Sequence, residues 1–477
     1  MDLDPLILSR IQFAFVVSFH AIFPVFTIGL ASYIAVLEGL SFKTKNPAWI
    51  KLSSFWTKVF AVVFGMGVVS GIVMSFQFGT NWSNFAQASA NFLGPMLSYE
   101  VITAFFLEAS FLGVLLFGRD RVPAGVHLFA AIMVATGTFI SSFWILSANS
   151  WMHTPVGTEL RDGVFYVTSW SEAIFNPSFP YRFTHMVVAS FLTGGFVVAG
   201  VSAWYLLIGR EVEANRKALS MCLWLLLFLA PAQAIIGDFH GLNTLEHQPM
   251  KVAAMEGHWE TSKNVPLLLF AIPDQENQTN RFEIGIPSLA SLILTHDLDG
   301  EILGLNEVAP QEQPPVAIVF WSFRIMVGLG LLMILFAFTG LILRKGGRIW
   351  RARWFLQGMR FMSVTPFIAV TAGWFVTEVG RAPWLVYGMM SQAEAVTPSL
   401  TGGMALFTLI GYVVVYSLVF SAGVYYLMRV LYVGLEDGED NGEPDPLERP
   451  KRPLSASHVP FELHNDSKAN PAEQGGH

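Results

Sequence analysis

The sequence has little charge and almost no cysteine. Only 13% of its 477 residues are charged, compared with about a quarter in ordinary soluble domains, and 53% are hydrophobic. The single cysteine, Cys222, lies in an apolar run, which excludes disulfides and thiolate metal sites. No stretch is basic enough for nucleic acid, and the first residues, MDLDPLILSR, lack the basic start of a cleaved signal peptide. These absences indicate an integral membrane protein.

Nine apolar runs are long enough to cross a bilayer, which takes about 20 residues. Because lipid offers backbone groups no hydrogen-bond partner, each run should be a helix. The predicted fold class is therefore an all-α integral membrane protein with about nine transmembrane helices. The runs are 11–38, 55–77, 95–117, 125–147, 184–208, 218–238, 316–343, 360–380 and 404–433.

Lysine and arginine concentrate in alternate short loops, which predicts that these loops are cytoplasmic. The N-terminus is then outside and the C-terminus in the cytoplasm. Transmembrane helices 1–6 are expected in residues 1–238, an outer-face loop in 239–315, helices 7–9 in 316–435 and a disordered cytoplasmic tail in 436–477. The basic residues are Lys43, Lys45 and Lys51 in the first loop, Arg119 and Arg121 in the third, Arg210, Arg216 and Lys217 in the fifth, and Arg344, Lys345, Arg348, Arg351 and Arg353 in the seventh.

Few ionisable residues fall inside the expected helices, where each charge costs roughly 2.5–3.5 kcal/mol. With this topology four of the potential metal ligands, His20, His185, Met326 and Glu378, all lie in the outer half of the membrane. A bundle core that holds a metal or cofactor would place them at one depth. The residues selected are His20, Glu100, Glu108, His185, Arg324 and Glu378, together with Met326.

Histidine, methionine and carboxylate without cysteine argue against zinc and iron–sulfur sites. A His–Met pair is an axial pair for a low-spin haem, and methionine raises its potential. His20 and Glu378 would remain as single ligands, which leave one iron face open for oxygen chemistry. Arg324 and Arg381 could neutralise haem propionates.

Glu100 and Glu108 lie eight residues apart on one expected helix. A regular α-helix separates them by about 12 Å along its axis and by about 80° around it. Spaced carboxylates in a helix bundle suit a proton relay. Ser141, Ser142 and Asn149 could extend it by hydrogen bonds.

Simpler interpretations remain open for each residue. A histidine in the membrane can bond a neighbouring helix, and Glu378 can pair with Arg381 at i,i+3. His127 and His153 lie near helix ends and are expected at the membrane interface. Two other functions are also open: a proton-carrying transporter, and a haem protein that passes electrons to a partner without reducing oxygen.

Several stretches together resemble subunit I of the cytochrome bd quinol oxidases, over nearly the whole chain except the tail. They are LSRIQFAFVVSFH around His20, FQFGTNWS at 76–83, YEVITAFFLEASFLG around Glu100 and Glu108, FWILSANSWM at 143–152, FRIMVG around Met326, and GWFVTEVGRAPW around Glu378.

This resemblance implies haem ligands. His185 and Met326 match the axial ligands of a low-spin haem b, and Arg324 matches a charge beside it. His20 and Glu378 match the ligands of a high-spin pair, haem b and haem d, with the assignment between them open. Haem b takes the place of haem d in some relatives. Trp374 matches an aromatic residue between haems.

The resemblance also implies that the outer loop oxidises quinol. Lys251 and Glu256, in QPMKVAAMEGHWET, match residues linked to that reaction and should lie on a short helix. An exposed carboxylate there could accept a quinol proton and release it outside. The protons consumed at the di-haem site would come from the cytoplasm past Glu100 and Glu108, so turnover would be electrogenic.

The family further implies a second membrane subunit in a heterodimer, small single-helix subunits and the bacterial cytoplasmic (inner) membrane. The short loop resembles the branch that includes cyanide-insensitive oxidases. One departure is Ala382 in GRAPW, where the family usually has glutamine.

Overall fold

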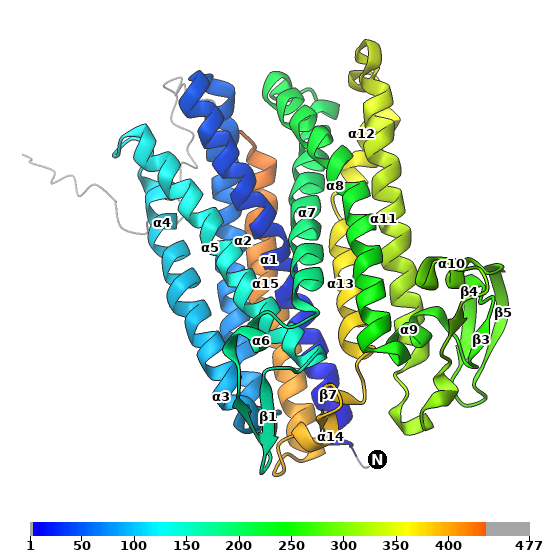
Figure 1. The fold of residues 1–477 in the computed structure, drawn as a ribbon. Helices are drawn as coiled ribbons and strands as arrows, with labels where there is room; N and C mark the ends of the chain where they lie inside the picture. Colours follow the sequence, from blue (N-terminus) through cyan, green and yellow to red (C-terminus); the bar gives the residue numbers. More distant parts are fainter. Residues whose placement is uncertain (1–2, 436–477) are drawn as a thin grey trace, which may run out of the picture. The chain divides into compact units, whose positions relative to one another are not determined.

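The structure, a computed structural model, describes residues 3–435. Nine of the helical spans in this part of the chain are long and apolar enough to cross a membrane, which confirms the predicted fold class (Figure 1). The predicted tail, 436–477, lies outside the described residues. The spans are α1 (Pro5–Thr44), α2 (Pro47–Thr80), α3 to α4 (Ser83–Phe117), α5 (Ala124–His153), α7 (Phe179–Leu207), α8 (Val212–His247), α11 (Val316–Arg344), α12 with α13 (Arg353–Val379) and α15 (Gly402–Val433).

The helices extend beyond the apolar runs because local signals, and not hydropathy, end them. Asp4 caps α1 by accepting from the Leu6 amide, and Pro5 opens the helix. A large difference is in α8, which was expected to end at 238 and continues to His247. Its last turns are polar but contain no helix breaker before Pro249. The outer loop therefore begins nine residues later than predicted.

Two of the spans are not continuous α-helices. A π-helix, η1 (Val101–Phe105), separates α3 (Ser83–Glu100) from α4 (Phe106–Phe117). The eighth span, expected as one helix over 360–380, consists of α12 (Arg353–Met362) and α13 (Thr365–Val379). The break precedes Pro366, which fits the first turn of α13 but would remove a backbone hydrogen bond inside a continuous helix.

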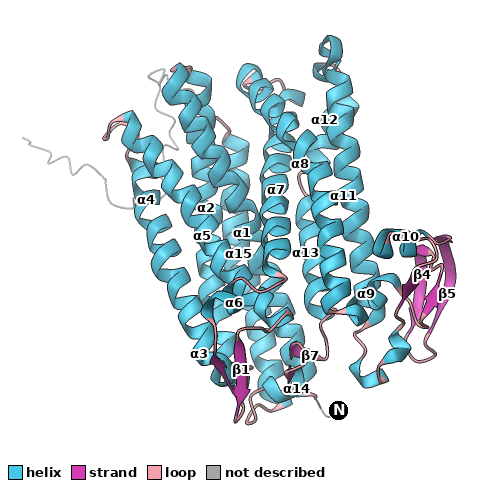
Figure 2. Ribbon diagram, in the orientation of Figure 1, coloured by secondary structure: helices cyan, strands magenta, loops and turns pink. Residues whose placement is uncertain are grey.

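Short sheets and helices gather at one end of the bundle, here called the sheet end (Figure 2). At this end α5 stops and α1 begins. Its elements are β1 (Thr158–Arg161) with β2 (Val164–Val167), α6 (Trp170–Ile174), α9 (Pro249–Glu256), β3 (Ser262–Lys263) with β6 (Glu301–Ile302), β4 (Leu267–Asp274) with β5 (Thr279–Ile286), α10 (Leu289–Thr295), η2 (Leu305–Glu307), η3 (Pro310–Glu312), β7 (Trp384–Val386) with β8 (Met390–Ser391), and α14 (Gln392–Ala395). A further helix, η4 (Lys345–Trp350), lies at the opposite end.

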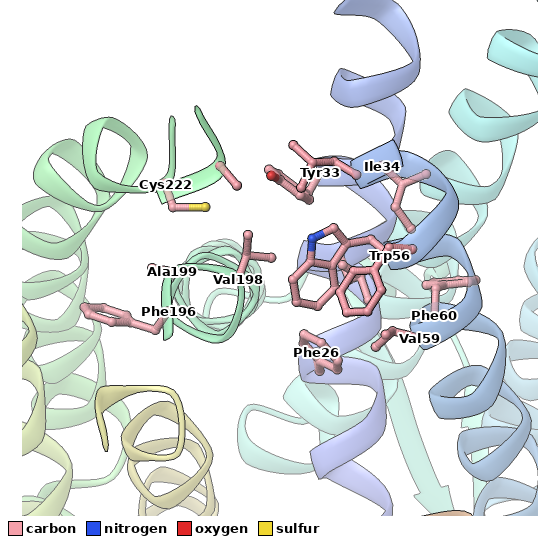
Figure 3. Close-up of a cluster of buried hydrophobic side chains, with 14 of the residues drawn as sticks. Phe26, Tyr33, Ile34, Trp56, Val59, Phe60, Phe196, Val198, Ala199 and Cys222 are labelled. Atoms are coloured by element: carbon pink, nitrogen blue, oxygen red, sulfur yellow. The ribbon is translucent and has the colours of Figure 1, made fainter. Parts of the chain in front are cut away.

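The apolar core lies between the helices away from the sheet end. Trp56, Phe60 and Phe196 are fully buried there, and Cys222 lies in the same cluster (Figure 3). Helices α1 and α7 approach closely, because a Cβ on Gly29 would lie 2.3 Å from the Ser190 carbonyl oxygen. Small residues at such contacts let membrane helices pack tightly. The rigid packing fixes the rotation of each helix, and hence the direction of its polar side chains.

Candidate functional site

Glu378, in the last turn of α13, is the centre of a buried polar cluster. Its Oε2 accepts a hydrogen bond from Nη2 of Arg381 at 2.5 Å. Its Oε1 accepts from Nδ2 of Asn149 at 2.9 Å and from Nε2 of His153 at 3.3 Å. Arg182 of α7 lies 3.9 Å from Oε1 and donates to Oδ1 of Asn149 at 2.5 Å. The predicted Glu378–Arg381 contact is therefore present, as part of a larger group.

Lys251 joins this group from α9. Its Nζ lies 3.1 Å from Nδ1 of His153. Nδ1 then accepts a hydrogen bond from Lys251, so the imidazole carries its proton on Nε2. The Nε2–H group donates a hydrogen bond to Glu378. Burial, reinforced by Arg182 and Arg381, lowers the pKa of Lys251 well below its usual value. We call Asn149, His153, Arg182, Lys251, Glu378 and Arg381 the Glu378 cluster.

The Glu378 cluster contains more positive than negative charge. It has one carboxylate against two guanidinium groups, Arg182 and Arg381, each less than 10% exposed, while the pKa of the third basic group, Lys251, is lowered. Nε of Arg182, and Nε and Nη1 of Arg381, find no hydrogen-bond partner within residues 3–435. Unpaired buried charge costs several kcal/mol, so acidic groups of a bound molecule would stabilise the cluster. A flat group with two carboxylate arms fits this requirement.

His20 of α1 presents one ring nitrogen to the bundle interior. Its Nδ1 lies 2.9 Å from Oγ of Ser70, and that hydroxyl donates to the Gly67 carbonyl at 2.9 Å. The hydroxyl must therefore accept from Nδ1–H, which leaves the lone pair on Nε2. This arrangement, with one nitrogen held by a second residue and the other free, is that of metal-ligating histidines.

His185 and Met326 lie in spaces that glycines leave open. A Cβ on Gly237 of α8 would lie 3.4 Å from Cε1 of His185, and one on Gly373 of α13 would lie 3.0 Å from Sδ of Met326. Nδ1 of His185 is buried without a hydrogen-bond partner in the described chain. Since buried polar atoms are nearly always bonded, a free imidazole nitrogen fits a ligand role. The helices that carry these residues, α7, α8, α11 and α13, pack against one another.

Among residues 3–435, no three His, Cys, Asp or Glu side chains gather as a metal-binding group. A metal held by one or two of these side chains needs its other ligands from elsewhere, and a porphyrin supplies them. Trp374 lies one turn before Glu378, and its Nε1 is buried without a partner in that same part of the chain. An open apolar groove of about 320 Å³ runs along α1 and α13, lined in part by Phe15, Phe19 and Phe375.

Arg324 and Glu256, predicted at different sites, form an ion pair. Nη2 of Arg324 donates to Oε2 of Glu256 at 3.0 Å, and its Nε donates to the Leu268 carbonyl at 2.9 Å. Glu256 is only 5% exposed, so the expectation of an exposed carboxylate is wrong. Burial raises the pKa of Glu256, although Arg324 opposes the shift.

The short helix predicted around Lys251 and Glu256 is present as α9. The two side chains have different partners, because Lys251 joins the Glu378 cluster and Glu256 binds Arg324. A small cavity of about 50 Å³ lies beside Lys251, Arg381 and Tyr387. The loop thus connects the Glu378 cluster to α11.

Glu100 and Glu108 both face α5, in contrast to the 80° separation of a regular helix. Glu100 accepts from Oγ of Ser141 at 2.7 Å, as predicted. Glu108 lies against Gly137, where a Cβ would be 2.4 Å from its Cγ. Gly137 and Ser141 are one turn apart on α5, so the carboxylates occupy one stripe. The π-helix η1 between them changes the rotation, and such turns often mark functional sites. Ser142 instead bonds the Phe139 carbonyl in its own helix.

His127 and His153, which were expected at the membrane interface, are both buried within the protein. His153 lies one helical turn after Asn149, so both reach Glu378 from one face of α5. Arg182, one turn before His185, was missed because its helix was expected to begin at 184. The i,i+4 spacing of Asn149 and His153 was the sequence signal that could have identified these two residues as partners on one helix face.

A second buried group surrounds Glu38 of α1. Its carboxylate accepts from Nη2 of Arg119 at 2.5 Å, from Nδ1 of His127 at 3.0 Å and from Oγ of Ser53. Nε2 of His127 lies 3.1 Å from the Leu115 carbonyl. The group joins α1, α2, α4 and α5.

The nine membrane-spanning helices in residues 3–435 define a multi-pass membrane protein, and the His, Met and Glu side chains between them are residue types that hold a cofactor in a helix bundle. The sequence matches the family described as cytochrome bd terminal oxidase subunit I over residues 8–435. It is 36% identical to cytochrome bd ubiquinol oxidase subunit 1 of Bacillus subtilis (strain 168), over 93% of this chain and 97% of that one. It is 33% identical to cytochrome bd-II ubiquinol oxidase subunit 1 of Escherichia coli (strain K12), over 90% and 97%.

The fold is similar to that of the bd oxidase from Geobacillus thermodenitrificans, with a TM-score of 0.84 and 31% identity over 91% of this chain and 100% of that chain. The chain belongs to the cytochrome bd terminal oxidase subunit I family. Its class is therefore that of respiratory oxidoreductases, and membership implies haem as the cofactor.

Proposed function

We propose that this chain is the haem-bearing subunit of an oxidase that oxidises quinol at the sheet end and reduces oxygen to water at a di-haem site. The observation that carries the proposal is the Glu378 cluster, with its excess of buried positive charge beside a predicted iron ligand. The names of the two ubiquinol oxidase relatives support quinol as the electron donor.

His185 and Met326 would bind a low-spin haem b, and His20 and Glu378 would bind the high-spin pair. The third haem is haem d or a further haem b. When bound, these haems would supply electron transfer and oxygen binding at iron. The chain's own part is to hold them, and the free nitrogens of His20 and His185 support this role.

Arg182, Lys251 and Arg381 would bind the haem propionates, which would satisfy the guanidinium atoms that have no partner in the described residues. Arg324, beside Met326 in sequence, would link the low-spin haem to the quinol loop. Trp374 would lie between haems.

Glu256 would accept a proton from quinol, and Lys251 would position the loop. A carboxylate with a raised pKa is a better base near neutral pH than an ordinary glutamate. Its ion pair with Arg324 holds the side chain in one place. Because Arg324 is two residues from Met326, oxidation of quinol would take place close to the first electron acceptor.

Glu100 and Glu108 would carry protons from the cytoplasm to the di-haem site. Both face α5, and the last turns of this helix carry Asn149 and His153 of the Glu378 cluster. Protons consumed from one side and released on the other would make turnover electrogenic. Oε1 of Glu108 has no hydrogen-bond partner in residues 3–435 and is a natural position for a water on this route.

The proposed setting is the bacterial cytoplasmic membrane, with the sheet end and N-terminus outside and the C-terminus in the cytoplasm. Arg119 and Arg344, at the end away from the sheets, support this orientation through the excess of positive charge on cytoplasmic loops. A second membrane subunit would complete the enzyme, with small single-helix subunits in addition.

The visible spectrum of the purified complex, dithionite-reduced minus air-oxidised, tests the proposal together with haem extraction and quinol-driven oxygen uptake. We expect b-type bands with or without a red chlorin band, and oxygen uptake that depends on quinol. His185→Ala should remove the low-spin band. His240→Ala, at a half-buried histidine whose ring centroid is 5.4 Å from that of His185, should retain it.

Absence of haem would support a proton-carrying transporter and overturn the proposal. Haem without quinol-dependent oxygen uptake would support a haem protein that passes electrons to a partner without reducing oxygen. A chlorin band would establish haem d, and b-type bands alone would establish the variant with haem b in its place.

A further inference from the structure

The hairpin formed by β4 and β5 exposes an apolar surface that no described residue covers. Phe282 is 76% exposed and Ile284 62%, and Leu269, Ile272 and Ile286 are also exposed. Phe282 lies in a bulge, since two residues of β5 lie opposite one of β4 between the pairs Phe270–Ile284 and Ile272–Arg281. An exposed apolar edge strand in water would favour aggregation, so this surface requires a partner.

The contact between Leu268 of β4 and α11 gives the depth of the hairpin's first residues in the membrane. Both Nε and Nη2 of Arg324 donate to the Leu268 carbonyl, at 2.9 and 2.7 Å. Arg324 and Arg344 span most of α11, and their separation along the helix is about 30 Å, the thickness of the hydrocarbon core. Because Arg344 ends the helix on one side of the membrane, Leu268 lies at the boundary between hydrocarbon and headgroups on the other side.

The hairpin also continues the lipid-facing side of α11. Phe270 contacts the ring of Trp321 edge-on, with 5.2 Å between centroids. Ile318 and Ile325 lie three residues before and four after Trp321, and both are exposed on this membrane-spanning helix. Trp321 thus lies between the hairpin and this exposed stripe, so the two apolar surfaces adjoin.

The chemistry of β5 limits how deep it can lie. Arg281 and Glu283 are exposed on the same strand as Phe282 and Ile284, and an unpaired strand edge needs water for its backbone groups. Both conditions hold in the headgroup region, where apolar side chains insert by about 5–10 Å.

We propose that the β4–β5 hairpin is a lipid-contact element, which inserts Phe282 and Ile284 into the leaflet at the sheet end. The partner is the bilayer surface itself, bound through apolar insertion. The proposal is independent of the haem and quinol assignments, because it rests on exposure, depth and continuity with α11 alone. Its consequence is that the lipid boundary lies beside the Arg324–Glu256 pair, which binds the same strand.

Spin labels measure this contact in the complete complex reconstituted in lipid nanodiscs. Phe282→Cys and Ile284→Cys carry nitroxides, with Glu276→Cys at the hairpin turn as the aqueous control and Leu331→Cys on α11, 60% exposed, as the lipid control. Cys222 is buried in the core and should remain unlabelled. Each labelled complex is first required to retain the wild-type visible spectrum.

We expect the labels at Phe282 and Ile284 to collide with oxygen more often than with a water-soluble nickel complex, as at Leu331, and the label at Glu276 to show the reverse. Nickel access at Phe282 equal to that at Glu276 would show an aqueous surface and overturn the proposal. Low access to both reagents would show that protein covers the hairpin, which also overturns it.

Discussion

Replacing Glu38 tests whether buried polar contacts hold the helices together away from the proposed haem site. Leucine keeps most of the side-chain volume and removes every acceptor. In Glu38→Leu, the hydroxyl of Ser53 and the ring N–H of His127 lose their acceptor in a region where both residues are almost fully buried. Arg119 is about a quarter exposed and can turn toward water.

The magnitude follows from these three donors. A buried donor without a partner costs about 1–3 kcal/mol, so Ser53 and His127 together cost about 4 kcal/mol, and the exposed guanidinium adds little. About 430 residues that unfold with an entropy near 2.1 cal/mol/K each give roughly 0.9 kcal/mol per kelvin. We therefore expect Tm to fall by about 4 °C. The Tm of Glu38→Gln should fall by less, because the amide N–H can donate to Nδ1 of His127 while the amide oxygen accepts from Arg119.

The assay is thermal unfolding of the complete complex in detergent, with Glu213→Leu as the control. Glu213 forms an exposed i,i+4 pair with Lys217 at 2.7 Å, which is worth less than about 0.5 kcal/mol, so its Tm should change by less than about 1 °C. A Tm for Glu38→Leu within about 1 °C of wild type, or a larger loss in Glu38→Gln than in Glu38→Leu, would refute the reasoning.

Three further predictions concern the proposed reaction. Burial raises the pKa of Glu256, and this base must be unprotonated to accept a proton, so quinol oxidation should accelerate as pH rises through that pKa. Glu256→Gln should flatten the pH–rate profile. An unchanged profile would exclude Glu256 as the base. Gly373→Val should push Sδ of Met326 out of place, since even a Cβ lies 3.0 Å from it, and reduce the low-spin band in the difference spectrum; a wild-type band would contradict this ligand. Ser70→Ala removes the acceptor of Nδ1 of His20 and should lower oxygen uptake about 10-fold with the low-spin band intact, whereas full turnover would separate His20 from the iron.

The sequence alone was sufficient for the number and class of the helices, because a 30 Å hydrocarbon layer requires long apolar segments and permits only helical backbone in them. It was also sufficient to select Glu378 and His20, since a polar group in such a segment is costly and therefore rarely incidental. The family motifs around these residues indicated the same family that the comparisons found. These properties depend on local composition, which a linear pattern records.

The tertiary structure decided which side chains meet. Arg324 binds Glu256, 68 residues away, and His153 turns into the Glu378 cluster instead of toward the interface. The π-helix η1 aligns Glu100 and Glu108 on one stripe of α5, where a regular helix would not. Hydropathy gives the depth of each residue but not the rotation of its helix, which is set by close packing with neighbours such as the Gly29 contact between α1 and α7. For that reason the chemistry of the site emerges only when the helices are assembled.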